Sequence, residues 1–265
     1  MKNILTILLG IACVSVLIYG HFHWNQRIEA APAKSPNLST KEIETQTDKK
    51  QETSKPSKNL LNYTSNWPKA AVERWKQTQG EKKPFKILFA GSPAIGTDTT
   101  GTYAIVKDKL LATFGENNLQ VAIKTFNSTS TQVITNKKQD EIAAEEADLI
   151  ILEPFILLNN GNVLMQNTVN DIKTMIDDIK AKNSDAVILL QPSYPLYKAK
   201  IYPSQVEQLK QFAELQKLTY LDHWTAWPDA NTEEIKEYVT PDQSAPSEKG
   251  NQVWSEYLLH YLINQ

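Results

Sequence analysis

Apolar and polar positions alternate in a regular way from Pro84 to the end of the chain. Short apolar runs are separated by longer stretches in which apolar residues recur at helical spacing. Runs that are apolar throughout are typical of strands buried on both faces, and helices between them make the strands parallel. We therefore expect strands at Phe85–Ala90, Leu119–Thr125, Ala147–Leu152, Ala186–Leu190 and Leu218–Leu221.

The stretches around these strands predict amphipathic helices. A first helix begins at Pro68 and ends at Gly80, because proline suits the first helical position. The others are expected at Tyr103–Phe114, Thr131–Ala144, Val169–Lys182 and Pro203–Gln216, with a last one near Glu248–Ile263. Strands that alternate with helices predict an α/β fold with three layers, α/β/α, around a doubly wound parallel sheet of five strands.

The amino terminus has a different pattern. Ile4 to Gly20 is a nearly unbroken apolar run that follows Met1, Lys2 and Asn3, as in a signal anchor or a signal peptide. We assign residues 1–24 to this segment. The small residues Ala31 and Ala33 flank a proline and lie well downstream, so we expect an uncleaved single-pass anchor in the cell membrane, with secretion as the alternative. Lys2 favours a cytoplasmic amino terminus, which makes the remaining chain extracytoplasmic.

The next segment links the anchor to the folded part. Glu29 to Asn59 is rich in Lys, Glu, Thr, Ser and Pro and has few large apolar residues. Such a composition does not bury enough surface to offset the entropy of the chain. We expect residues 25–62 to form a disordered tether and residues 63–265 to form one domain.

Composition excludes several classes of function. The chain has 28 basic and 30 acidic side chains and no basic patch, so nucleic acid is not an expected partner. The single cysteine, Cys13, lies in the apolar run, which leaves the folded part without thiol chemistry. The domain has two histidines, His223 and His260, without metal-ligand spacing, so we expect no metal and no cofactor.

Ser92 is the candidate nucleophile. It follows the first expected strand on a short turn, where a hydroxyl is presented at the carboxyl edge of a parallel sheet. A serine needs a base within hydrogen-bond reach. His223, after the fifth strand, is an alternative base, with packing against Trp224 and Trp227 as the competing interpretation. Glu153, after the third strand, is a further carboxylate near the same edge, or else a surface-loop residue.

Two sequence blocks resemble the SGNH or GDSL-type hydrolases over Pro84 to Gln265. Ala90-Gly91-Ser92-Pro93-Ala94-Ile95-Gly96 is similar to the block in which Gly-Asp-Ser-Leu carries the nucleophile, with Gly91 in place of the aspartate. The stretch from Asp242 to Gly250, which leads into the last helix, resembles the block Asp-x-x-His-Pro-x-x-x-Gly, with Ala245 in place of the histidine.

The resemblance implies a flavodoxin-like sheet and a serine ester hydrolase. It implies Ser92 as the nucleophile, Asp242 in the base or orienting role, and Asn160 with the backbone N–H groups of Ser128 and Ser130 as oxyanion donors. By analogy and location, the implied substrates are acyl esters of cell-envelope glycans. Because Ala245 replaces the histidine, the alternative is an inactive SGNH fold that binds a glycan or an envelope partner.

Overall fold

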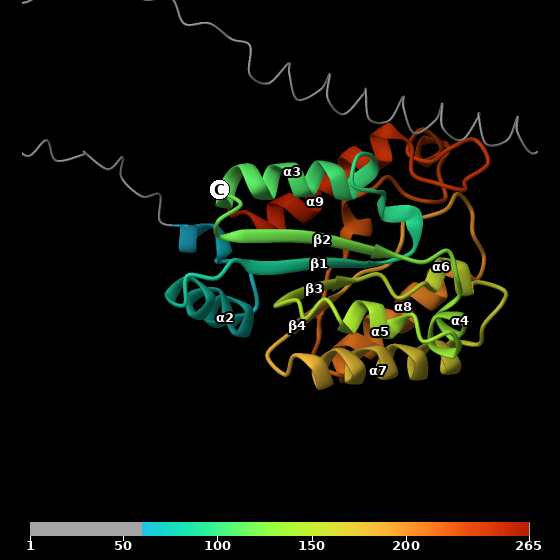
Figure 1. Cartoon of the computed structure of the whole chain (residues 1–265). Helices are drawn as coiled ribbons and strands as arrows, with labels where there is room; N and C mark the ends of the chain where they lie inside the picture. Colours follow the sequence, from blue (N-terminus) through green and yellow to red (C-terminus); the bar gives the residue numbers. More distant parts are fainter. Residues whose placement is uncertain (1–59, 265) are drawn as a thin grey trace, which may run out of the picture. The chain divides into compact units, whose positions relative to one another are not determined.

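The computed structural model describes residues 60–264, so the expected anchor and most of the expected tether lie outside the described residues. The described part is built on a parallel sheet with the strand order β2-β1-β3-β4-β5 (Figure 1). The alternating pattern predicts such a doubly wound parallel sheet, and the strand order is the flavodoxin-like one that the resemblance implies. The strands are β1 (Phe85–Gly91), β2 (Leu119–Thr125), β3 (Leu149–Leu152), β4 (Val187–Leu190) and β5 (Thr219–Tyr220).

Helices cover both faces of the sheet, with α3 and α9 on one side and α5 and α7 on the other in Figure 1. The helices that contribute to the first core are α2 (Lys69–Gly80), α3 (Gly101–Phe114) and α9 (Glu248–Leu262). Those of the second core are α4 (Ser130–Thr135), α5 (Gln139–Ala143), α6 (Ile156–Asn159), α7 (Met165–Lys182) and α8 (Tyr202–Leu215). The sheet is therefore the middle of three layers.

The strand β1 shows why its sequence is apolar at all but one of its side-chain positions. Phe85, Ile87 and Phe89 belong to the first core, whereas Leu88 and Ala90 belong to the second. Successive side chains of a strand point to opposite faces. Helices cover both sides of the strand, so its positions are apolar except for Lys86, which is half-buried and pairs with Glu145.

Several expected elements have ends shifted by a few residues, as in α7, which begins at Met165 and not at Val169. Three larger details also differ from the sequence expectations. The helix expected at Thr131–Ala144 is two short helices, α4 and α5, because Lys137 between them has a left-handed backbone with φ of 54°. The short helix α6 was not expected. Leu60 and Leu61, which fall in the expected tether, pack against the first core.

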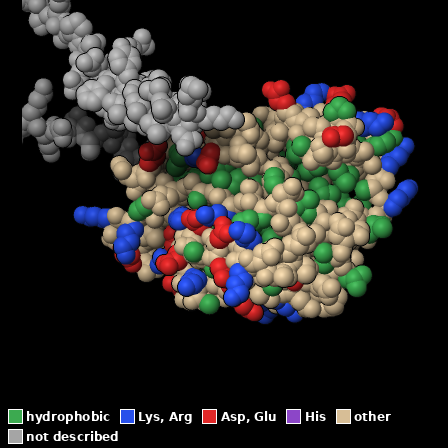
Figure 2. Space-filling model, turned by 45° about the vertical axis from the view of Figure 1, so that its right-hand side comes forward, with side chains coloured by type: hydrophobic (Ala, Val, Ile, Leu, Met, Phe, Trp, Pro, Cys, Tyr) green, Lys and Arg blue, Asp and Glu red, His purple; other side chains and the backbone are tan. Residues whose placement is uncertain are grey.

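No helix among residues 60–264 is both long and apolar enough to cross a membrane. In the view of Figure 2, charged side chains of both signs are interspersed over the lower left of the surface, and uncharged atoms dominate its middle.

Candidate functional site

The two sequence blocks meet in one pocket. Ser92, which follows β1, and Ala245, which precedes α9, line the same cavity of about 290 Å³. The full lining is Ser92, Pro93, Ala94, Asn127, Leu157, Leu158, Tyr194, Ser244 and Ala245. Residues more than 150 positions apart in the chain are thus brought together where open α/β folds place their ligands.

Ser92 is held firmly by its backbone but not by its hydroxyl. Its N–H donates to Glu153 Oε2 at 2.8 Å, and the residue leads into the 3-10 turn η2 (Pro93–Ile95). The Ser92 side chain is buried, and within the described residues its Oγ has no hydrogen-bond partner. The hydroxyl lies where a nucleophile is expected, without a histidine to accept its proton.

Ala245 cannot supply that base. Its N–H donates to Thr240 Oγ1 at 3.2 Å, and its methyl group borders the pocket. An aliphatic side chain has no group that accepts or donates a proton. The position at which the resemblance expects a histidine therefore lies at the pocket of Ser92 but carries no group that could act as a base.

The Asp242 carboxylate is hydrogen-bonded within its own turn. Its Oδ1 accepts hydrogen bonds from Thr240 Oγ1 at 2.6 Å, from Ser244 Oγ at 2.8 Å and from the Ser244 N–H at 3.1 Å. The Thr240 bond, followed by those from Ser244, lowers the pKa of Asp242 to about 2. A carboxylate that holds its charge so firmly is a weak general base near neutral pH. Asp242 lines a separate hollow of about 400 Å³ together with Asn160.

His223 is a structural histidine by its contacts. It is fully buried, and its ring stacks on Trp254 with centroids 4.5 Å apart. Nδ1 accepts from Trp227 Nε1 at 3.0 Å, so Nε2 carries the proton and donates to the Pro192 carbonyl at 3.0 Å. Burial lowers the pKa of His223 to about 4. Neither ring nitrogen is free to act on Ser92, while the other domain histidine, His260, is exposed on α9.

Of the expected oxyanion donors, Ser130 is already engaged. Its N–H donates to Asn159 Oδ1 at 2.8 Å, and its Oγ donates to Asp171 at 2.7 Å. The Asn159 side chain also donates to Ser130 Oγ and to Thr168 Oγ1. Asn159, not its neighbour Asn160, thus enters the buried polar network between α4, α6 and α7. The structure does not bring Asn160 or Ser130 to the pocket of Ser92.

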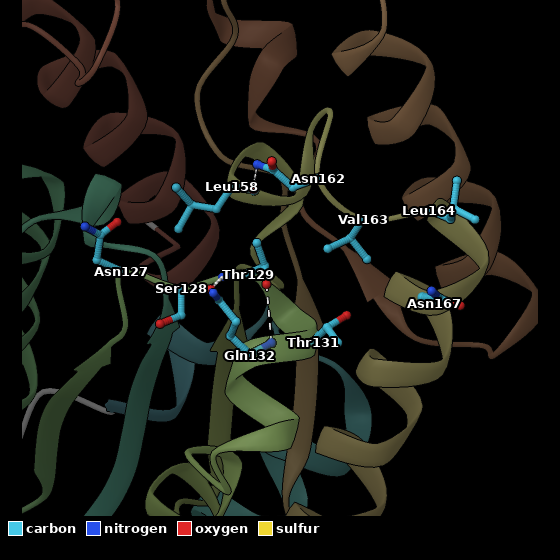
Figure 3. A pocket seen from close by; sticks show the side chains of 10 residues that line it. All are labelled: Asn127, Ser128, Thr129, Thr131, Gln132, Leu158, Asn162, Val163, Leu164 and Asn167. Atoms are coloured by element: carbon cyan, nitrogen blue, oxygen red, sulfur yellow. Dashed lines mark hydrogen bonds between the residues drawn. The ribbon is translucent and has the colours of Figure 1, made fainter.

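Ser128 lies in a larger adjoining pocket of about 610 Å³ (Figure 3). Asn127 and Leu158 line both this pocket and that of Ser92. The other lining residues are Thr129, Thr131, Gln132, Asn162, Val163, Leu164 and Asn167. Amides, hydroxyls and aliphatic groups make up this surface. Asn127 is the residue that sequence reasoning missed, although its place directly after the second strand pointed to the same edge.

Glu153 is buried beside Ser92, so its interpretation as a surface-loop residue is wrong. Its side chain is almost fully buried, and no partner among the described residues bonds its Oε1. Burial raises the pKa of Glu153, opposed first by the Ser92 side chain and then by the backbone N–H groups of Ser92, Phe155 and Ile156. The Ser92 hydroxyl lies close enough to favour the charged carboxylate, although no hydrogen bond of normal geometry links Oγ to it.

Because Gly91 has no side chain, Glu153 can pack directly against its backbone. A Cβ atom at position 91 would lie 2.6 Å from the carbonyl oxygen of Glu153 and 2.7 Å from its Cβ. Both distances are far inside van der Waals contact. Any side chain at position 91, including the aspartate of the GDSL-type block, would overlap residue 153 in this arrangement of the two strand ends.

Within residues 60–264 no three His, Cys, Asp or Glu side chains gather as a metal site would require. The pocket offers the hydroxyls of Ser92 and Ser244 and the amide of Asn127, and the carboxyl group of Glu153 is buried beside Ser92. Such a set can bind a polar, uncharged ligand and, given a base for Ser92, can attack a carbonyl carbon.

Comparison with known proteins supports the fold. No protein-family model and no curated protein sequence matches the chain. Among solved structures, one named as a GDSL-like lipase from Parabacteroides merdae has a TM-score of 0.55 at 15% identity, covering 68% of this chain and 96% of that one. The acetylxylan esterase Axe2 from Geobacillus stearothermophilus has a TM-score of 0.53 at 17% identity, covering 67% and 94%.

A lipolytic protein of the G-D-S-L family from Desulfitobacterium hafniense is similar as well, with a TM-score of 0.51 at 15% identity, covering 66% of this chain and 98% of that one. These structures are matched over nearly their whole length. The described part of the chain therefore has the SGNH-hydrolase fold, as the two sequence blocks predicted.

The first test concerns the packing of Gly91. We expect Gly91→Ala to lower the free energy of unfolding by about 1–3 kcal/mol, because the added methyl group overlaps Glu153. Gly80→Ala is the matched control, since a Cβ there meets nothing within 4 Å; we expect it to be neutral or stabilising by up to about 1 kcal/mol. Urea-induced unfolding measures both. Equal stabilities of the two variants would show that Glu153 moves aside without cost.

The second test concerns His223. The pKa of the buried imidazole is about 4 in the folded state, below its unfolded value of 6.5, so the unfolded chain binds the proton more tightly. The stability that this group contributes is present above pH 6.5 and is lost as the pH falls toward 4, by about 3 kcal/mol.

Urea unfolding between pH 7 and pH 4 measures this slope in the wild type and in His223→Gln. We expect the variant to be less stable at pH 7, because it loses the stacking on Trp254, but to depend less on pH in this window. His260→Gln, at an exposed position, should keep the wild-type slope. An unchanged slope in His223→Gln would contradict the assignment of a neutral buried imidazole.

Proposed function

We propose that this chain is a membrane-tethered, extracytoplasmic ester hydrolase that removes acyl groups from cell-envelope glycans, with Ser92 as the nucleophile. The observation that carries the proposal is that Ser92 and Ala245, from the two blocks that resemble SGNH hydrolases, line one pocket at the carboxyl edge of the sheet. The likeness to the acetylxylan esterase Axe2 supports an ester of a carbohydrate as the substrate class.

In this reaction Ser92 Oγ attacks the carbonyl carbon of the ester, the alcohol leaves, and water then releases the acid from the acyl-serine. The oxyanion that forms needs hydrogen-bond donors. Asn127, exposed at the mouth of the Ser92 pocket, takes the role that the resemblance gave to Asn160. The adjoining pocket, lined by amides and hydroxyls, suits the hydroxyl groups of a neutral sugar chain.

The location is part of the proposal. In this proposal residues 1–24 anchor the chain in the cell membrane, and the residues from 25 up to the folded part, which begins at Leu60, link the anchor to the domain. Fractionation of cells that express the full chain tests the location, since a cleaved form would appear in the medium.

The second candidate is a binding module without catalysis. Ala245 and the buried, unpartnered hydroxyl of Ser92 favour it, because a serine without a base reacts slowly. The same pockets would then hold a glycan without cleaving it. The two candidates differ in one measurable respect, namely whether replacing Ser92 lowers the rate of ester hydrolysis.

The test uses the full chain with an activated acetyl ester and with acetylated xylo-oligosaccharides. We expect slow hydrolysis by the wild type and loss of the enzymatic rate in Ser92→Ala. We expect Ala245→His to raise the rate by about tenfold or more, since loss of a triad member costs several powers of ten. An unchanged rate in Ser92→Ala overturns the role of Ser92. Glycan binding with no gain in Ala245→His favours the binding module.

A further inference from the structure

Two buried oxygens of neighbouring residues have no hydrogen-bond partner among the described residues. They are Ser92 Oγ and Glu153 Oε1, and the same two residues are joined through the Ser92 N–H and Glu153 Oε2 at 2.8 Å. Buried polar atoms are nearly always paired, because an unpaired one costs about 1–3 kcal/mol. Two unpaired polar atoms on residues that are hydrogen-bonded to each other are therefore a feature that the stability of the fold does not explain.

The register of the sheet places the two residues together. β1 and β3 are parallel neighbours in which Ala90 lies opposite Leu152, so the residues that follow these positions leave the sheet side by side. The Glu153 N–H donates to the Ala90 carbonyl at 2.8 Å, which continues the ladder by one step. Gly91 then leaves the space for the Glu153 side chain. The carboxyl group next to Ser92 thus belongs to the residue that follows β3, and not to the residue that precedes the serine in the sequence.

The environment of Glu153 is uncharged. Within the described residues it forms no salt bridge, and the titratable groups that face it are the phenols of Tyr194, after β4, and Tyr202, on α8. Burial raises the pKa of both tyrosines, which keeps them neutral. Phe155, two residues on, has a left-handed backbone with φ of 62°, a conformation that costs a bulky residue energy and is concentrated at functional sites.

We propose that Glu153 is the acid–base partner of Ser92 in the reaction proposed above, on which this inference rests. Glu153 Oε1 accepts the Ser92 Oγ proton as Oγ bonds to the ester carbonyl carbon, and returns it to the departing alkoxide oxygen as the C–O bond breaks. In the second half the attacking water gives a proton to Glu153, which passes it to Ser92 Oγ as the acid leaves. Burial, which raises the pKa of Glu153, makes it a stronger base than an exposed carboxylate.

Glu153 does not line the pocket while the Ser92 hydroxyl is buried, so it exchanges protons with the leaving oxygen and the water only after the Ser92 side chain has turned toward the pocket. Attack requires the Ser92 side chain to rotate so that its buried hydroxyl faces both the pocket and Glu153 Oε1. The residue therefore contacts the reacting serine and leaves the recognition of the substrate to the groups around the cavity.

The experiment measures the reactivity of Ser92 directly. The full chain is treated with a fluorophosphonate, which labels activated serines, and the modified residue is quantified by mass spectrometry as a function of pH. We expect the wild type to be labelled at Ser92, faster as the pH rises and Glu153 loses its proton. Glu153→Gln should be labelled at least about tenfold more slowly and without this pH dependence. Glu256→Gln, on the exposed side of α9, is the matched control and should behave as the wild type.

Measuring the stability of Glu153→Gln distinguishes the loss of a base from the loss of the fold. In Glu153→Gln the amide oxygen still accepts from the Ser92 N–H, and the buried carboxylate is gone. Because the folded pKa of Glu153 is raised, the stability that its protonation contributes is present below the unfolded value and is lost as the pH rises through the folded value. Glu153→Gln should thus be at least as stable as the wild type above neutral pH. Glu153→Asp, which keeps a shorter carboxyl group, should recover part of the labelling.

Each result decides between the two proposals. Labelling of a folded Glu153→Gln at the wild-type rate overturns the role of Glu153. Ester hydrolysis that depends on Ser92 but survives in Glu153→Gln also overturns it, and leaves the proposed function intact. If the wild type is neither labelled at Ser92 nor hydrolyses esters, both the inference and the hydrolase assignment fail, and the binding module remains.

Discussion

The hydrogen bond from the Ser92 N–H to Glu153 Oε2 fixes the geometry of the whole site. It links the residue after β1 to the residue after β3, beside the pocket that Ser92 lines. Gly91 permits this close approach, because a Cβ atom at position 91 would overlap the carbonyl oxygen and the Cβ of Glu153. A residue with a side chain before the serine, such as the aspartate of the GDSL-type block, therefore does not fit this arrangement of the two strand ends.

The fold follows from the sequence because its signals are local and repeated. Each apolar run marks a strand, and the alternation of β1 side chains between two cores explains why Lys86 is the one polar residue in it. The exceptions depend on backbone conformation. A left-handed Lys137 divides an expected helix into α4 and α5, and a left-handed Phe155 precedes α6. Neither residue type favours the left-handed conformation. The surrounding packing therefore determines it, and it could not be predicted from the local sequence.

The location of the candidate site could be predicted from the sequence, but only some of the residues that form it could. The turn after the first strand located Ser92, and the block before the last helix located Ala245. Burial and hydrogen bonding decide the remaining roles. His223 is occupied on both nitrogens, Asp242 is bonded within its own turn, and Asn159 rather than Asn160 is drawn into the polar network. These outcomes depend on contacts between distant segments, which the spacing of residues along one chain does not specify.

Ala245 and Glu153 differ in what they contribute to the stability of the fold. A buried carboxyl group with an unpaired oxygen opposes folding, whereas an alanine at a pocket wall is neutral. A purely structural role at position 153 would be served better by a side chain that suits the apolar surroundings, because such a residue would avoid this penalty. The presence of the carboxyl group beside Ser92 is therefore the observation that favours the proposed action of Glu153 on the serine over a site that only binds.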